Sequence, residues 1–132
     1  MFNLDSLSLK DSVSYHVRHP VTDELLYGSD GLDNPVEIEL YGTSSKTYRI
    51  AISAMQNRAL KRGKKQATAE NLKEEGIELL VACSVKANNL SYAGNPIKDE
   101  VAFRALYSDP AFSWLKDQVD AALGDNSNFL PA

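Results

Sequence analysis

The feature that most constrains the fold is a change in hydrophobic periodicity close to residue 45. Before it, apolar residues alternate with polar ones, so that Val13, Tyr15 and Val17 share one side of an expected strand over residues 12–18. After it, apolar residues recur every three or four positions, which is the period of a helix. A chain with its strands first and its helices afterwards is predicted to be an α+β protein.

The strand region is expected to form a small antiparallel sheet. Residues 12–27 are interpreted as a hairpin whose connection contains Pro20 and Asp23, because proline cannot donate to a strand ladder and aspartate favours turns. Residues 36–41 repeat the alternation and supply a third strand. A sheet of this size is stable only when its apolar face is covered, so we expect the helical part to pack against it.

Two helices are expected in the middle of the chain. The first begins near Ser45 and carries an apolar stripe made of Tyr48, Ile52, Met55 and Ala59. The second begins at the N-cap candidate Thr68 and carries a stripe made of Leu72, Leu79, Leu80 and Cys83. Gly76 interrupts this second stripe at a cost of about 1 kcal/mol relative to alanine. It either permits a close crossing with another element or is a tolerated defect.

The C-terminal third is expected to be a loop followed by two helices. The loop covers residues 88–97, and a short helix follows over residues 99–107. Asp109-Pro110 opens the last helix, since proline is tolerated at a first helical position, and Gly124 is its natural stop. We therefore expect one α+β domain over residues 1–124, β-rich over 7–42 and helical over 45–124, with a C-terminal tail over 125–132.

Composition limits the class of protein. The 132 residues carry a net charge of −4, which argues against a general nucleic-acid binder. The single cysteine, Cys83, fits a reducing compartment. The chain has no apolar run of the roughly 20 residues that a membrane span needs, and its first residues do not resemble a secretory signal. These features lead us to expect a cytoplasmic protein without a membrane partner.

No pattern of residues points to catalysis or to a cofactor. His16, His19 and Cys83 lack the spacing of a metal site. Cys83 lies on an apolar helix face, where a thiol is normally inert, and no phosphate-binding glycine loop occurs. We therefore expect a protein that is not an enzyme and has no cofactor.

The most unusual local feature is a basic run over residues 58–65. It carries five cations, so the remainder of the chain sums to −9. On a continuous helix, the side chains on one face would be Arg58, Lys61, Arg62 and Lys65. The run is either a solvated helix end that stabilises the helix dipole or a docking surface for an acidic partner segment or a phosphate backbone.

Two aromatic features near the C-terminus have the same ambiguity. Trp114 lies beside the apolar stripe of the last helix, where it either broadens the core face or anchors a partner. Phe129 and Leu130 lie in an otherwise polar tail. They either fold back onto the domain or insert into a neighbouring protein.

The C-terminal region carries a resemblance to a known family. The pattern Ala105-Leu106-Tyr107, Asp109-Pro110, Trp114-Leu115, Gln118-Val119 and Ala122, closing with Asn128-Phe129-Leu130, resembles the phage tail assembly chaperones. The wider layout also agrees, with a hairpin over His19 to Leu26 and a charged helix in the middle of the chain. The resemblance covers most of the chain, and its specific part is 105–130.

The resemblance implies a non-enzymatic role in the cytoplasm of the infected cell. Such chaperones bind the long, helical tape-measure protein of a phage or prophage and keep it soluble until tail-tube subunits polymerise around it. In some relatives a frameshifted extension recruits the tail-tube protein, which is therefore a second candidate partner; a homo-oligomer is left open. The alternatives are a virion subunit, such as a head–tail connector or tail-completion protein, and a nucleic-acid-binding accessory protein that uses residues 58–65.

Overall fold

The computed structural model describes residues 1–29, 31–66 and 68–131. Its strands are β1 (Ser12–His16), β2 (Glu37–Tyr41), β3 (Ser84–Asn88), β4 (Ser91–Tyr92) and β5 (Asn95–Pro96). Its α-helices are α1 (Lys46–Arg62), α2 (Ala69–Cys83), α3 (Glu100–Ser108) and α4 (Ser113–Gly124). Short 3-10 turns are η1 (Leu4–Leu7), η2 (Lys64–Gln66), η3 (Pro110–Phe112) and η4 (Asn126–Phe129).

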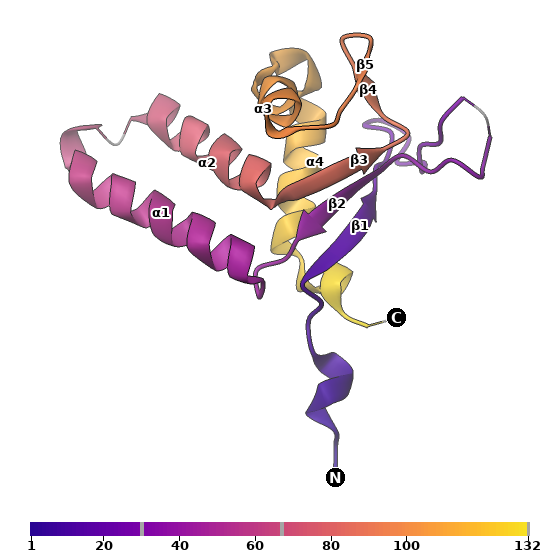
Figure 1. The fold of residues 1–132 in the computed structure, drawn as a ribbon, viewed down its shortest axis with the longest axis horizontal. Coiled ribbons are helices and arrows are strands. Elements are labelled where there is room, and N and C mark those ends of the chain that lie inside the picture. The colour runs from indigo at the N-terminus through magenta and orange to yellow at the C-terminus, as the bar shows by residue number, and fades with distance from the viewer. Residues whose placement is uncertain (30, 67, 132) are drawn as a thin grey trace.

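The predicted α+β class is confirmed, but the sheet is assembled from different segments than expected. β1, β2 and β3 form one antiparallel sheet in that order (Figure 1). Residues 24–27 do not form a regular strand; they contribute isolated bridges, Arg18 with Leu25 and Tyr27 with Pro35. β2 pairs directly with β1, and residues 84–88 supply the third strand on the other edge of β2.

An irregularity explains why β3 has no strand signal in its sequence. Ile38 pairs with Ala87 and Glu39 with Lys86, but Leu40 pairs with Ser84, so the register shifts between Glu39 and Leu40. A bulge of this kind places an extra residue in one strand and disrupts the alternation of its side chains. The expected loop over 88–97 also contains structure, because β4 and β5 pair as a short hairpin.

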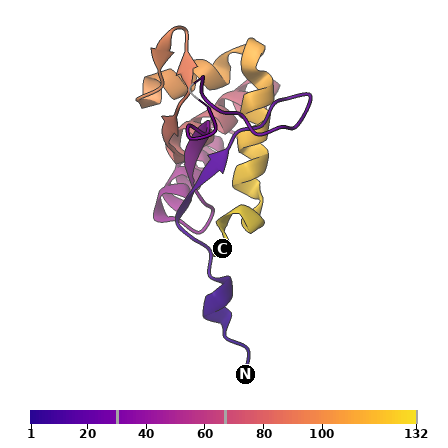
Figure 2. The same cartoon turned by 90° about the vertical axis from the view of Figure 1, so that its right-hand side faces the viewer.

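The predicted helices are confirmed, and three of them cover the sheet. Ile38 and Leu40 of β2 have no exposed surface and belong to the same core as Leu80, Phe103 and Val119, which come from α2, α3 and α4. Figures 1 and 2 show α4 running alongside the sheet. The sheet therefore has one face covered by helices, which is the arrangement that the alternation in its strands requires.

The C-terminal tail packs on this core through Phe129. Phe129 is 2% exposed, and its backbone carbonyl accepts a 2.7 Å hydrogen bond from the amide of Lys10. A Cβ atom added at Gly42 would lie 2.7 Å from the Phe129 ring, so only glycine allows the ring this position. Residues 1–7, in contrast, extend away from the body, and η1 buries none of its side chains (Figures 1 and 2).

Candidate functional site

Helices α1 and α2 form a hairpin that projects from the body (Figure 1). The Ser45 hydroxyl accepts a 3.1 Å hydrogen bond from the amide of Tyr48 and caps α1. Thr68 caps α2 in the same way through the amide of Asn71, as the sequence predicts. Although α1 is 17 residues long, none of its side chains is buried, so most of its surface has no partner within the described chain.

Two arginines of the basic run are used inside the molecule. Arg58 donates from its Nε and NH2 groups to both oxygens of Glu75, the shortest distance being 2.6 Å. Arg62 donates to Glu75 Oε1, also at 2.6 Å. The side chain of Glu75 is only 11% exposed, and the hydrogen bond from Arg58 is the main cause that lowers its pKa. This carboxylate ties α2 to α1.

The basic run does not form one helix face, which corrects the geometry inferred from its spacing. Gly63 adopts a positive φ of 73° and ends α1 at Arg62, so Lys64 and Lys65 lie in η2 instead. Lys61 and Lys65 are exposed, and neither makes an ion pair with a described residue. The structure therefore divides the predicted basic cluster into two paired arginines and several free lysines.

Sequence reasoning missed Glu75, the residue on which this division depends. It lies 17 residues after Arg58, on a different helix, and the sequence contains 18 acidic residues from which a partner could be chosen. A pairing across a helical hairpin depends on the rotation of both helices, and that rotation is set by their packing. A carboxylate on the side of α2 that faces α1 was the one signal that could have found it.

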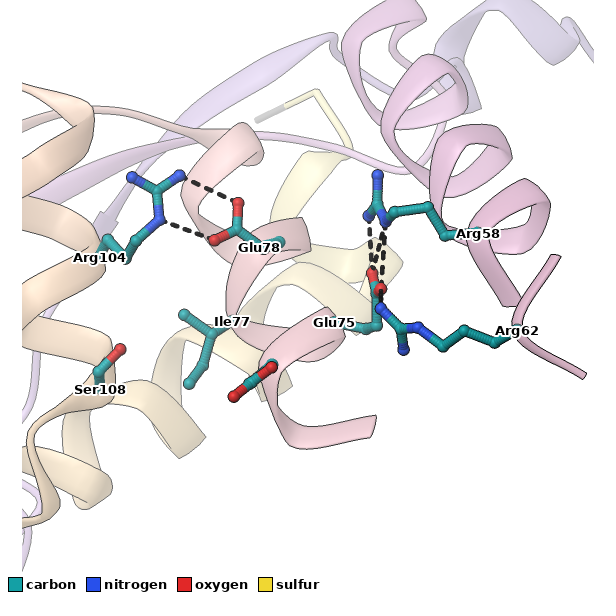
Figure 3. A pocket seen from close by; sticks show the side chains of 8 residues that line it. Arg58, Arg62, Glu75, Ile77, Glu78, Arg104 and Ser108 are labelled. Atoms are coloured by element: carbon teal, nitrogen blue, oxygen red, sulfur yellow. Dashed lines mark hydrogen bonds and ion pairs between the residues drawn. The ribbon is translucent and has the colours of Figure 1, made fainter. Parts of the chain in front are cut away.

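A charged cavity of about 530 Å³ lies beside these ion pairs (Figure 3). Its other side is lined by Glu78 and Arg104, which pair at 2.7 Å and link α2 to α3. Arg104 also pairs with Glu100 at 2.8 Å. Every arginine that lines this cavity is thus engaged by a carboxylate of the same chain. The arrangement holds helices together and leaves no unpaired arginine at the cavity, although Glu74, which also lines it, makes no ion pair with a described residue.

A second cavity, of about 280 Å³, is a mainly apolar groove between α1 and α2. We call it the hairpin groove; its apolar lining consists of Met55, Ala59, Leu72, Gly76 and Leu79. At 3.6 residues per turn, Gly76 lies about 160° around α2 from Glu74 and Glu78, which line the charged cavity. The two cavities share Arg62 and Glu75 in their lining, so they lie on either side of these ion pairs.

Gly76 is the open point of the hairpin groove. A Cβ atom added there would have no heavy atom within 4 Å, so no described element crosses α2 closely at this position. The adjacent Leu72 is 64% exposed, and Leu60, near the end of α1, is 81% exposed. Glycine thus leaves a stretch of α2 backbone uncovered beside the exposed Leu72, which lines the same groove. A soluble protein tends to expose such a surface where something binds to it.

The aromatic anchors proposed from the sequence lie elsewhere. Trp114 is half-buried and packs against the core, which fits its interpretation as a broadening of the core face. Phe129 is buried in that core and Leu130 is half-buried beside it. Of the two alternatives for Phe129, the structure has the ring folded back onto the domain, where it fills the space over Gly42. These residues and the basic run are not brought together.

The two histidines and the cysteine contact other parts of the same chain or are buried in it. The ring of His16 contacts the Leu26 carbonyl at 2.7 Å, and His19 Nδ1 accepts from the amides of Val21 and Thr22. Burial raises the pKa of the Cys83 thiol to about 11. No cluster of three or more metal-ligating side chains occurs among the described residues. Nor does any described helix have the length and apolar character needed to cross a membrane.

Comparison of the chain with protein-family models, with curated protein sequences and with solved structures finds no match.

Proposed function

We propose that this chain is a non-enzymatic phage tail assembly chaperone that binds the tape-measure protein in the host cytoplasm and keeps it soluble while the tail tube assembles. The observation that carries the proposal is the hairpin groove, an apolar surface on a projecting pair of helices. The sequence resemblance over residues 105–130 supplies the family. The tail-tube protein is a second candidate partner under the same proposal.

The physical basis is the burial of an apolar helix face. A long helical protein without its tube exposes an apolar stripe, and such a stripe binds well in an apolar groove between helices. The hairpin groove offers Met55, Leu72 and Leu79 for this contact. The groove lies between α1 and α2. A partner that fills it would not displace the buried side chains of the body.

The direct test is co-expression with the tape-measure protein of the same phage or prophage. We expect the soluble fraction of that protein to rise with the wild-type chain and with Gly76→Ala. It should fall back with Gly76→Phe, whose ring would occupy the groove. Both substitutions replace glycine in a helix interior, where either new residue is intrinsically more favourable. A client that stays insoluble with the wild-type chain contradicts the chaperone role.

The structure also bears on the two alternatives. A nucleic-acid-binding role would have to use Lys61, Lys64 and Lys65, because Glu75 already engages Arg58 and Arg62. Binding to duplex DNA that falls steeply with salt would support that role. Recovery of the chain from purified virions would instead favour a head–tail connector or tail-completion protein.

A further inference from the structure

We propose that the hairpin groove is a docking site for an acidic amphipathic helix of the partner protein, seated against the exposed backbone at Gly76. This inference rests on the proposed function and adds the chemistry of the bound segment. It follows from three properties of the hairpin: the size of the groove, the glycine at its open point, and the net positive charge of the two helices.

The size of the groove fits a few apolar side chains of one helix. A cavity of about 150 Å³ accommodates one benzene molecule, so the 280 Å³ of the hairpin groove has room for about two apolar side chains. Two anchors spaced three or four residues apart lie on one face of a helix. A helix laid along the groove would place two such anchors among Met55, Leu72 and Leu79.

Gly76 sets how closely that helix can approach. The space beside its Cα is empty to at least 4 Å, and its backbone needs no positive φ. Glycine therefore serves no conformational purpose here, while it costs about 1 kcal/mol relative to alanine in a helix. Small residues at a helix surface let a second helix pack with its backbone close by. A binding partner gives this glycine a role that the isolated chain does not.

The charge of the hairpin selects an acidic occupant. The hairpin, residues 46–83, contains eight cationic side chains and four acidic ones, a net charge of +4, whereas the rest of the chain sums to −8. Glu75 engages Arg58 and Arg62. The six other cations make no ion pair with a described residue; they are Lys46, Arg49, Lys61, Lys64, Lys65 and Lys73. Complementary charge at the rim of an interface steers association and rejects wrong partners.

The same charge disfavours the hairpin of a second copy as the occupant. Two hairpins docked groove to groove would bring +4 against +4, and like charges facing each other across an interface cost several kcal/mol. A helix with acidic residues around an apolar stripe matches both the apolar lining of the groove and the positive charge of the hairpin. A basic helix with the same apolar stripe matches only the lining.

The experiment uses two synthetic peptides with the full-length protein. Both are amphipathic helices of about 18 residues, five turns, with identical leucine stripes; the polar positions are glutamate in one peptide and lysine in the other. Binding is measured by fluorescence anisotropy at low and high salt. We expect the glutamate peptide to bind, with an affinity that falls as salt rises, and the lysine peptide to bind at least about tenfold more weakly.

Groove variants locate the binding. Gly76→Phe and Leu72→Asp should each weaken the glutamate peptide by about tenfold or more, as expected when one anchoring contact is lost, while Gly76→Ala, which adds only a methyl group, should weaken it less. Leu72 is 64% exposed, so its substitution is compatible with folding, and circular dichroism checks both variants. Equal binding of the two peptides, or full affinity in both groove variants, overturns the inference. So does a homodimer that dissociates in both variants, because a second copy would then fill the groove.

The outcomes for the inference and for the chaperone role are separable. If wild-type protein raises client solubility but the glutamate peptide does not bind at the groove, the inference fails and the chaperone role stands. If the peptide binds at the groove but the tape-measure protein remains insoluble, the docking site stands and the chaperone role fails.

Discussion

The body of the protein and the α1–α2 hairpin are stabilised in different ways. In the body, β2 and the helices α3 and α4 bury large side chains together, including Phe103, Tyr107 and Phe129. The hydroxyl of Tyr107 meets that of Ser84 at 2.8 Å, so even its polar atom is satisfied. In the hairpin, α1 has no fully buried side chain, although Tyr48 packs against the core. The ion pairs of Glu75 are its main polar link to α2.

This difference separates folding from binding. Burial of apolar surface is the largest favourable contribution to folding, and the body contains almost all of it. The hairpin leaves apolar surface in solvent that a partner can later cover. Substitutions in the body should therefore change stability, whereas substitutions in the groove should change binding and leave stability nearly untouched. Three predictions test this comparison.

The largest effect is expected from Phe129→Ala. The ring of Phe129 is 2% exposed and fills the space over Gly42. Truncation of such a buried phenylalanine typically costs about 3–5 kcal/mol. The free energy of unfolding can be measured by urea denaturation, with Leu130→Ala as a half-buried control that should cost less. Equal costs for the two variants would place residues 125–132 outside the core. Truncation after Gly124 is expected to destabilise the domain for the same reason.

A smaller and pH-dependent effect is expected from Glu75→Gln. Its arginine partners hold the pKa of Glu75 below the ordinary value of 4.5, so its ion pairs contribute stability above that value. This contribution is lost as pH falls through the lower pKa of the folded state. The wild type should have a higher Tm than the variant at pH 7, and the gap should close toward pH 3.

The comparison of the wild type with Glu75→Gln contains its own control. Arg104 also lowers the pKa of Glu78. Glu78 is present in both proteins, and the charge of Glu75 is the smallest of the causes that shift its pKa, so most of its contribution cancels in the Tm gap. A gap that stays constant from pH 7 to pH 3 would show that Glu75 acts through packing and not through its charge.

The smallest effect on stability is expected from Leu72→Ser. Leu72 is 64% exposed, and substitutions at exposed positions usually change the free energy of unfolding by no more than about 0.5 kcal/mol. Urea denaturation measures this value, and the co-expression assay should show loss of client solubility in the same variant. A large loss of stability would mean that the hairpin has a core of its own.

The periodicity of the sequence was sufficient to predict the class of fold and the positions of its helices. The change of period near residue 45, the caps at Ser45 and Thr68, and the stop at Gly124 depend on neighbours within a few residues. Such local interactions can be recognised from the spacing of residues along the sequence. The third strand was not predictable in this way, because the irregularity between β2 and β3 removes the alternation that identifies a strand.

The candidate site was less predictable than the fold. The sequence drew attention to residues 58–65 and to Gly76, and both lie in the hairpin. It did not reveal that Glu75 engages two of the arginines, that Phe129 is buried, or that Gly76 faces open space. Each of these facts depends on which distant segments meet and at what rotation. Those long-range contacts are chosen by the packing of the whole chain, so only the tertiary structure decided them.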